Sequence, residues 1–218
     1  MEDNLDFFTP KMRNYREIMR RKLRRVSPEH IVPPRYRNCF ASIDSKRFEI
    51  ERPSGPNNQQ YYLYNSYYAC HNLGYQSVVV PDGIIAHFSG PFAGSGNDLN
   101  FLADSNFLTK LSDALYDHEG LQDERMEVVA DRIYDITARG IKSLRKNPTP
   151  LQHLIDESAI RIRIPNEWTF GKISLHFPFV DIGYRLKINE RDVGNYIIVA
   201  ALFTNLHTCL YGSNCANY

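Results

Sequence analysis

Four acidic residues in this chain stand where a strand, a loop or a helix could bring a carboxylate to a common point. Asp44 ends an apolar run, Asp98 follows a glycine-rich stretch, Asp131 directly follows the short run 127–130, and Glu167 lies where a helical pattern begins again. Carboxylates from neighbouring strands and one helix can converge at one edge of a sheet. Each close pair of such charges costs roughly 4 kcal/mol at an effective dielectric near 20. Such a cluster persists when a cation neutralises it, so we predict an acidic site for divalent metal.

A hard cation suits these ligands. Mg²⁺ or Mn²⁺ accepts an all-oxygen shell, keeps several waters and leaves room for phosphate oxygens. Two such ions can activate water on one side of a phosphate and stabilise the leaving oxygen on the other. The four acids therefore predict a site that cuts a phosphodiester backbone. For Asp98 a second interpretation stays open, because Asn97 or Asp98 could instead cap a helix that runs through residues 99–111.

The strands that would position these acids follow from alternating apolar residues. We predict a strand region within 37–51, which carries Asp44, and an antiparallel hairpin with arms at 75–80 and 84–88 joined by Asp82-Gly83. A further short strand is predicted at 127–130. The tyrosine-rich stretch that begins at Tyr61 favours sheet packing, with base stacking as the alternative. Strands, a helix, one more strand and then helices indicate a mixed α/β domain.

Two helices are predicted in the last third of the chain. A helical pattern starts at Leu151, and Pro165 should break or kink it, so that Glu167 opens a fresh helical turn. Asp192 should cap a last helix from Val193 to about Leu206, apolar enough to be largely buried. Pro148 and Pro150 mark the approach to the first of these helices.

Composition limits the classes of partner. The chain has 218 residues and a net charge of +1, so affinity for nucleic acid must come from local patches. Two basic segments, 11–25 and 139–146, could contact phosphates. The first has the pattern of a basic amphipathic helix, which could equally be a nuclear-import signal or a solvated face. No apolar run approaches the roughly 18 residues of a membrane span, and we predict no membrane partner.

Other site chemistries find little support in the sequence. The four cysteines form no C-x-x-C pair, which favours reduced thiols in an intracellular compartment. The seven histidines lack the spacing of a zinc site. No Gly-x-Ser-x-Gly elbow is present, and the glycine-rich stretch 90–96 lacks the order of a phosphate-binding P-loop.

Six short blocks, in order, resemble one known family. FASID (40–44), ERP (51–53) and YQSVVVPDGI (75–84) are similar to the first half of the DDE endonuclease domain of Harbinger-type transposases. GPFAGSGND (90–98), ADRIY (130–134) and NEWTFGK (166–172) are similar to its later blocks. The resemblance runs from about Cys39 to Leu210.

The resemblance implies a ribonuclease-H-like fold, a mixed sheet flanked by helices, with the acids at strand ends and on one helix. It implies that Asp44, Asp131 and Glu167 form the catalytic triad of a metal-dependent DNA nuclease. Asp98 would be an additional ligand of the Mg²⁺ or Mn²⁺. One departure is Asp44-Ser45-Lys46, where the family commonly has Asp-Gly-Thr, and Lys46 could perturb the site. Another is Ala130-Asp131, where the family often has Gly-Asp.

The predicted organisation is a basic N-terminal arm and linker (1–38), a DDE endonuclease domain (39–211) and a tail (212–218). About 38 residues precede the nuclease blocks, where the family usually carries a helix-turn-helix region. We therefore expect that a separate DNA-binding protein could assist, and we expect a nuclear location. The alternative function is a catalytically inactive, domesticated transposase-derived module that binds DNA or protein.

Overall fold

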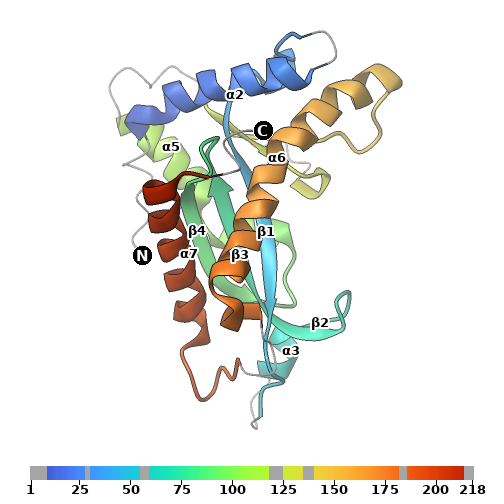
Figure 1. Cartoon of the computed structure of the whole chain (residues 1–218). Coiled ribbons are helices and arrows are strands. Elements are labelled where there is room, and N and C mark those ends of the chain that lie inside the picture. The colour runs from blue at the N-terminus through green and yellow to red at the C-terminus, as the bar shows by residue number, and fades with distance from the viewer. Residues whose placement is uncertain are drawn as a thin grey trace.

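A computed structural model describes residues 9–27, 30–54, 59–117, 125–134, 140–181 and 186–213. It is built on a mixed sheet flanked by helices (Figure 1), which confirms the predicted mixed α/β class and is consistent with a DDE nuclease fold. The strands are β1 (Cys39–Glu49), β2 (Tyr64–Asn65), β3 (Cys70–Val79), β4 (Ile85–Ala93), β5 (Glu127–Ala130) and β6 (Ile141–Ser143). The helices are α2 (Met12–Val26), α3 (Gln59–Leu63), α4 (Asp98–Asp104), α5 (Phe107–Asp117), α6 (Pro150–His176) and α7 (Val193–Tyr211).

The sheet leaves one edge of its central strand open. β3 pairs antiparallel with β1 and with β4, which confirms the predicted hairpin. β5 runs parallel to β1, and β6 runs parallel to β5. The pairing of β1 with β5 ends at Ser42 and Val129, while β1 continues for seven residues to Glu49. Within the described residues, β1 beyond Ser42 therefore pairs only with β3, and Asp44 lies on this free stretch.

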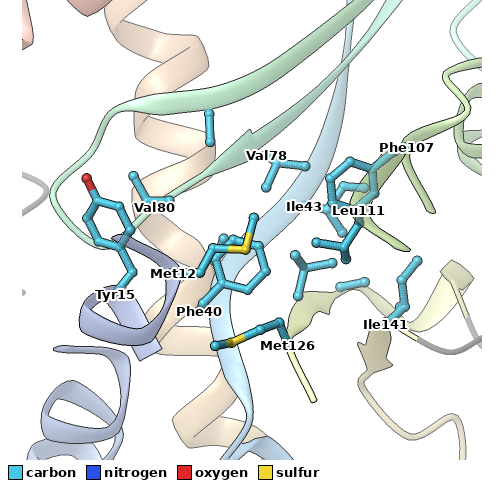
Figure 2. Packing of buried hydrophobic residues seen from close by; sticks show 14 of the residues in the cluster. Met12, Tyr15, Phe40, Ile43, Val78, Val80, Phe107, Leu111, Met126 and Ile141 are labelled. Atoms are coloured by element: carbon cyan, nitrogen blue, oxygen red, sulfur yellow. The ribbon is translucent and has the colours of Figure 1, made fainter. Parts of the chain in front are cut away.

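Each face of the sheet has its own core. On one face α6 and α7 cover a cluster in which aromatic side chains of β1, β3 and β4 meet Phe170. On the other face α2, α4 and α5 cover a second cluster. Figure 2 shows Met12 of α2 close to Phe40 in this second cluster, with Phe107 and Leu111 of α5 near Ile43.

The apolar side of α2 is shared between two clusters: Met12 and Tyr15 belong to this second cluster, whereas Met19 and Leu23 pack in a third one that includes residues of α6. Met12, Tyr15, Met19 and Leu23 are all buried, and the helix lies across one end of the sheet (Figure 1). The amphipathic pattern predicted for residues 11–25 is confirmed as a helix. The domain boundary predicted between residues 38 and 39 stays a prediction.

The predicted helix through residues 99–111 is in fact two helices. α4 ends at Asp104 and α5 begins at Phe107, and Asn106 between them has φ of +53°, a conformation that helices do not contain. Asn97 caps α4: its side chain accepts from the backbone N of Asn100 at 3.0 Å. In turn, the side chain of Asn100 accepts from the backbone N of Asn97. Capping is therefore done by Asn97, and the carboxylate of Asp98 is left for another role.

The predicted break at Pro165 is wrong, because α6 runs without interruption through it. Proline removes one helical hydrogen bond, but the residues around it are held from outside the helix. Asn166 donates to the backbone O of Ser42 at 2.9 Å and accepts from the Ser77 hydroxyl at 2.7 Å. These buried contacts with β1 and β3 fix the helix across the proline. Strand β6 was also missed, since three residues are too few for a visible alternation.

The last helix is capped by Asp192, as predicted, through the backbone N of Asn195. Its predicted burial is wrong: one side packs on the sheet, while apolar side chains on the other are exposed, namely Tyr196, Val199, Leu202, Phe203, Leu206, Leu210 and Tyr211. Within the described residues α7 is the one helix whose length and apolar composition would let it cross a membrane, a test that core helices of soluble proteins also pass. The absence of a membrane partner stays a prediction.

Candidate active site

Asp44 lies on β1 just beyond the end of β5. Its carboxylate accepts from the backbone N of Ser45 at 3.0 Å, and its side chain is 17% exposed. Burial, the largest cause, together with the charges of Glu167 and Asp98 raises the pKa of Asp44 to about 6, against the opposing effect of Arg163. The carboxyl is thus largely shielded from water, and other acids crowd it.

Arg163 of α6 lies at the centre of this crowding. Its guanidinium is 3.4 Å from the Asp44 carboxylate, 3.7 Å from that of Asp131 and 3.9 Å from that of Glu167. The arginine side chain is only 8% exposed, and its Nε has no hydrogen-bond partner among the described residues. Three predicted site residues are therefore brought together around one buried cation.

The helical and strand positions explain this convergence. Glu167 is one turn beyond Arg163 on α6, so both side chains share a face of the helix. Asp131 directly follows β5, and its carboxylate is held by the backbone N of Arg132 at 2.6 Å. Because β5 stops where β1 runs on, the acid that follows β5 meets the free stretch of β1 that carries Asp44.

Asp98, the fourth predicted acid, is held by a different arginine. It is the first residue of α4, and the guanidinium of Arg47 lies 3.3 Å from its carboxylate. Burial raises the pKa of Asp98, as does the charge of Asp131, and Arg47 opposes both. The charge of Asp131 therefore acts on Asp98, although the ion-pair partner of Asp98 is Arg47 and not Arg163.

A network of hydrogen bonds between buried polar side chains lies next to the acids. The hydroxyl of Tyr134 lies 2.8 Å from that of Ser45 and accepts from the side-chain amide of Gln76 at 3.1 Å. Ser105, between α4 and α5, donates to the same Gln76. These hydrogen bonds tie β1, β3 and the segment after β5 together next to Asp44 and Asp131 in the sequence, which limits how far the two carboxylates can separate.

Lys46 does not enter the site, contrary to the expectation that it could perturb the acids. Its ammonium donates to the Ser174 hydroxyl at 2.8 Å and lies 3.4 Å from Asp181, over the ring of Phe48. It is two residues along β1 from Asp44 and points to the C-terminal half of α6. Serine and lysine in place of the family's usual residues therefore leave the carboxylates unobstructed.

The donor set fits a divalent cation in its chemistry, since all four side chains offer carboxylate oxygens. As they stand, however, no three His, Cys, Asp or Glu side chains in the described part of the chain form a group that could hold a metal ion. All three acids instead face the guanidinium of Arg163, at 3.4–3.9 Å. The geometry is that of three carboxylates that share one arginine, whose single positive charge offsets only part of theirs.

The two basic segments differ in what their charges do. On α2 Arg21, Arg24 and Arg25 are exposed and line an open surface hollow together with His30. In the segment 139–146, Lys142 lies 3.1 Å from Glu127. Arg145 of the same segment is paired with Asp156 at 2.7 Å, and Arg139 lies outside the described residues. Among the residues that the structure describes, only the first segment presents a row of exposed arginines.

Sequence reasoning missed the two arginines that hold the acids. Arg163 could have been found from its four-residue spacing to Glu167, which places the two on one helical face. Arg47 carried no comparable signal, because its partner Asp98 comes from a helix 51 positions later in the sequence. Long-range pairs of this kind require the fold.

A comparison with protein families agrees with this geometry. The family model described as DDE superfamily endonuclease matches residues 43–205, most of the chain, and the matched region contains all four acids and both arginines. The model is that of the superfamily and does not distinguish the Harbinger type. Neither the search of curated proteins nor that of solved structures gave a match.

Proposed function

The chain belongs to the DDE superfamily endonucleases, and on that premise we propose that it hydrolyses phosphodiester bonds of DNA at Asp44, Asp131 and Glu167. The observation that carries this proposal is the convergence of three carboxylates, from β1, the end of β5 and α6, within 3.4–3.9 Å of one guanidinium. The Harbinger type and the ribonuclease-H-like fold are part of the proposal, supported by the ordered sequence blocks and by the mixed sheet flanked by helices.

Mg²⁺ or Mn²⁺ would be held by these three acids with Asp98 as a further ligand. When bound, such an ion neutralises the carboxylates and polarises a phosphate oxygen. The chain's own residues fix the acids in place. Asn166 ties α6 to Ser42 and Ser77, and this sets the separation of Glu167 from Asp44. Arg163 supplies part of the balancing charge when no metal is present.

The DNA backbone would lie along α2 in this proposal. The exposed arginines Arg21, Arg24 and Arg25 form the open basic surface, and each phosphate contact adds salt-dependent affinity. The segment 139–146 is a weaker candidate, because Lys142 and Arg145 already have carboxylate partners. A chromosomal DNA substrate would place the protein in the nucleus.

Nicking of supercoiled plasmid in the presence of Mn²⁺ tests the proposed activity. We expect the wild-type chain to convert supercoiled to open-circular DNA, and the double variant Asp44→Ala/Glu167→Ala to lose at least a hundredfold in rate. Glu157→Gln is the matched control, because Glu157 lies on the same helix and pairs with His153 rather than with the site. Its rate should equal that of the wild type. Wild-type nicking no faster than that of the double variant would contradict the proposal.

One observation favours a second function, a binding module that kept the fold without the chemistry. Arg163 already pairs with all three acids and offsets part of their charge, so the cluster has a counter-charge without metal. Mn²⁺ titration separates the two functions. A saturable rise in melting temperature that disappears in Asp131→Ala supports the nuclease, whereas no rise at millimolar Mn²⁺ supports the binding module.

A further inference from the structure

Five exposed tyrosines form a surface that the nuclease site does not use. Tyr61, Tyr62, Tyr64, Tyr67 and Tyr68, here called the tyrosine platform, are between 43% and 87% exposed. By contrast Tyr75 on β3 is fully buried in the core between the sheet and α7. The tyrosine-rich region thus divides into one ring that packs the sheet and five that face solvent. A cluster of large exposed rings marks an interaction surface.

The backbone beneath the tyrosine platform is anchored. Asn65 is buried, donates to the backbone O of Gly94 at 2.7 Å and accepts from the backbone N of Tyr67 at 3.0 Å. The backbone O of Tyr62 accepts from Ser95 at 3.0 Å. Gly94 has no room for a Cβ, which would come within 2.5 Å of the backbone O of Leu63. The rings therefore project from a fixed frame, and little backbone entropy is lost when a ligand binds them.

The rings themselves are arranged edge to face. The Tyr61 and Tyr62 centroids are 5.7 Å apart, and those of Tyr67 and Tyr68 are 4.9 Å apart, with interplanar angles near 80°. In such pairs one ring uses its edge, so a ring face stays available for a flat partner. Tyr64 makes a similar contact with His71 at 5.2 Å.

The tyrosine platform is continuous with the acidic site through Arg47. The Arg47 guanidinium lies 5.3 Å from the centre of the Tyr68 ring and 3.3 Å from the Asp98 carboxylate. The sequence contains no acidic residue between Gln59 and Pro81. A polyanionic strand that reaches the site can therefore continue over these rings without meeting a carboxylate of this segment.

We propose that the tyrosine platform stacks unpaired bases of the DNA strand whose backbone enters the acidic site. This inference rests on the proposed function, because that function supplies the DNA. Stacking on aromatic rings tolerates every base, since each base has a flat face, and Arg47, which packs over the Tyr68 ring, holds that ring in place. The substrate would then be a strand with unpaired bases next to the cleavage point, rather than an uninterrupted duplex.

Fluorescence anisotropy with a labelled single-stranded oligonucleotide and its duplex tests this inference on the full chain. EDTA is present, so that binding is measured without cutting. We expect tighter binding of the single strand, and a loss of about tenfold or more in that affinity for Tyr67→Ser/Tyr68→Ser. Tyr67→Phe/Tyr68→Phe should bind the single strand as the wild type does, because the ring faces remain.

Tyr116→Ser is the matched control, since Tyr116 on α5 is 77% exposed and lies outside the tyrosine platform. It should leave both affinities unchanged. Equal affinity of the wild type for single strand and duplex would overturn the inference, as would unchanged single-strand affinity in the serine double variant. Because these measurements contain no metal, a failure to nick plasmid in Mn²⁺ would contradict the proposed function alone. Nicking that persists without any single-strand preference would contradict the stacking alone.

Discussion

Two arginine–carboxylate clusters lie about two turns apart on α6, and they are built differently. In the first, Asp156 is almost fully buried and accepts three close hydrogen bonds. These come from the Tyr36 hydroxyl at 2.7 Å, the guanidinium of Arg145 at 2.7 Å and the backbone N of Arg145 at 2.9 Å. In the second, Arg163 faces Asp44, Asp131 and Glu167 at 3.4–3.9 Å.

The difference is one of saturation. The first cluster has one carboxylate and enough donors to fill it, so nothing remains for a ligand. The second has three carboxylates around one guanidinium, at distances longer than those of a close charge-assisted hydrogen bond. A saturated pair braces the fold, in this case by joining α6 to the segments that follow β6 and precede β1. An excess of acid over base leaves oxygens that an added cation can bind.

The largest expected difference between the two clusters is in the change of unfolding free energy when a carboxylate of each is replaced by an amide. Asp156→Asn removes a buried charge that pairs with Arg145, and its amide nitrogen turns a donor toward groups that are themselves donors. It should therefore cost about 3 to 4 kcal/mol of unfolding free energy. Asp44→Asn should leave stability at pH 7 unchanged or higher, because it removes a charge whose burial is unfavourable and relieves repulsion from Glu167 and Asp98. Urea denaturation of both variants measures the contrast.

The conservative variant Glu157→Gln provides the control, as Glu157 lies next to Asp156 in the sequence and is half-exposed. Its stability should stay within about 0.5 kcal/mol of the wild type. Equal destabilisation by Asp156→Asn and Asp44→Asn would show that both clusters serve the fold, and the distinction drawn from saturation would fail.

How far the sequence predicted these clusters depends on the range of the contacts. The acids Asp44, Asp131 and Glu167 were predicted from strand ends and from ordered family blocks, and the fold brings them together. The brace around Asp156 was not predicted, because Tyr36 lies 120 positions away and gives no local signal. The uninterrupted α6 was missed for the same reason. Local rules place a break at Pro165, while Asn166 is held by Ser42 and Ser77, which lie far away in the sequence.

A smaller effect is expected in the pH dependence of the unfolding free energy, to which Asp44 of the second cluster contributes. The pKa of Asp44 is about 6 in the folded chain and about 3.9 in an unfolded one. The folded state thus holds this proton more tightly, and stability is lost as pH rises from about 4 to about 6. The loss through this group amounts to roughly 2 to 3 kcal/mol in metal-free buffer. Urea denaturation in EDTA at several pH values measures it.

Asp44→Asn provides the reference for this effect, because asparagine does not titrate. The wild type should lose stability relative to this variant between pH 4.5 and 7. Parallel stability curves for the two proteins would mean that the Asp44 carboxyl ionises as it does in an unfolded chain. The acids would then not be crowded, and the second cluster would be as well neutralised as the first.

The smallest effect concerns the arginines themselves. Arg163→Met removes the cation that shares the space between Asp44, Asp131 and Glu167, so Mn²⁺ should bind about tenfold more tightly, equivalent to about 1.4 kcal/mol. Electron paramagnetic resonance reports free Mn²⁺ directly and requires no nuclease activity. Arg145→Met should leave Mn²⁺ affinity unchanged, since Asp156 offers a single carboxylate. If Arg163→Met weakened Mn²⁺ binding, the arginine would be organising the acids rather than competing for them.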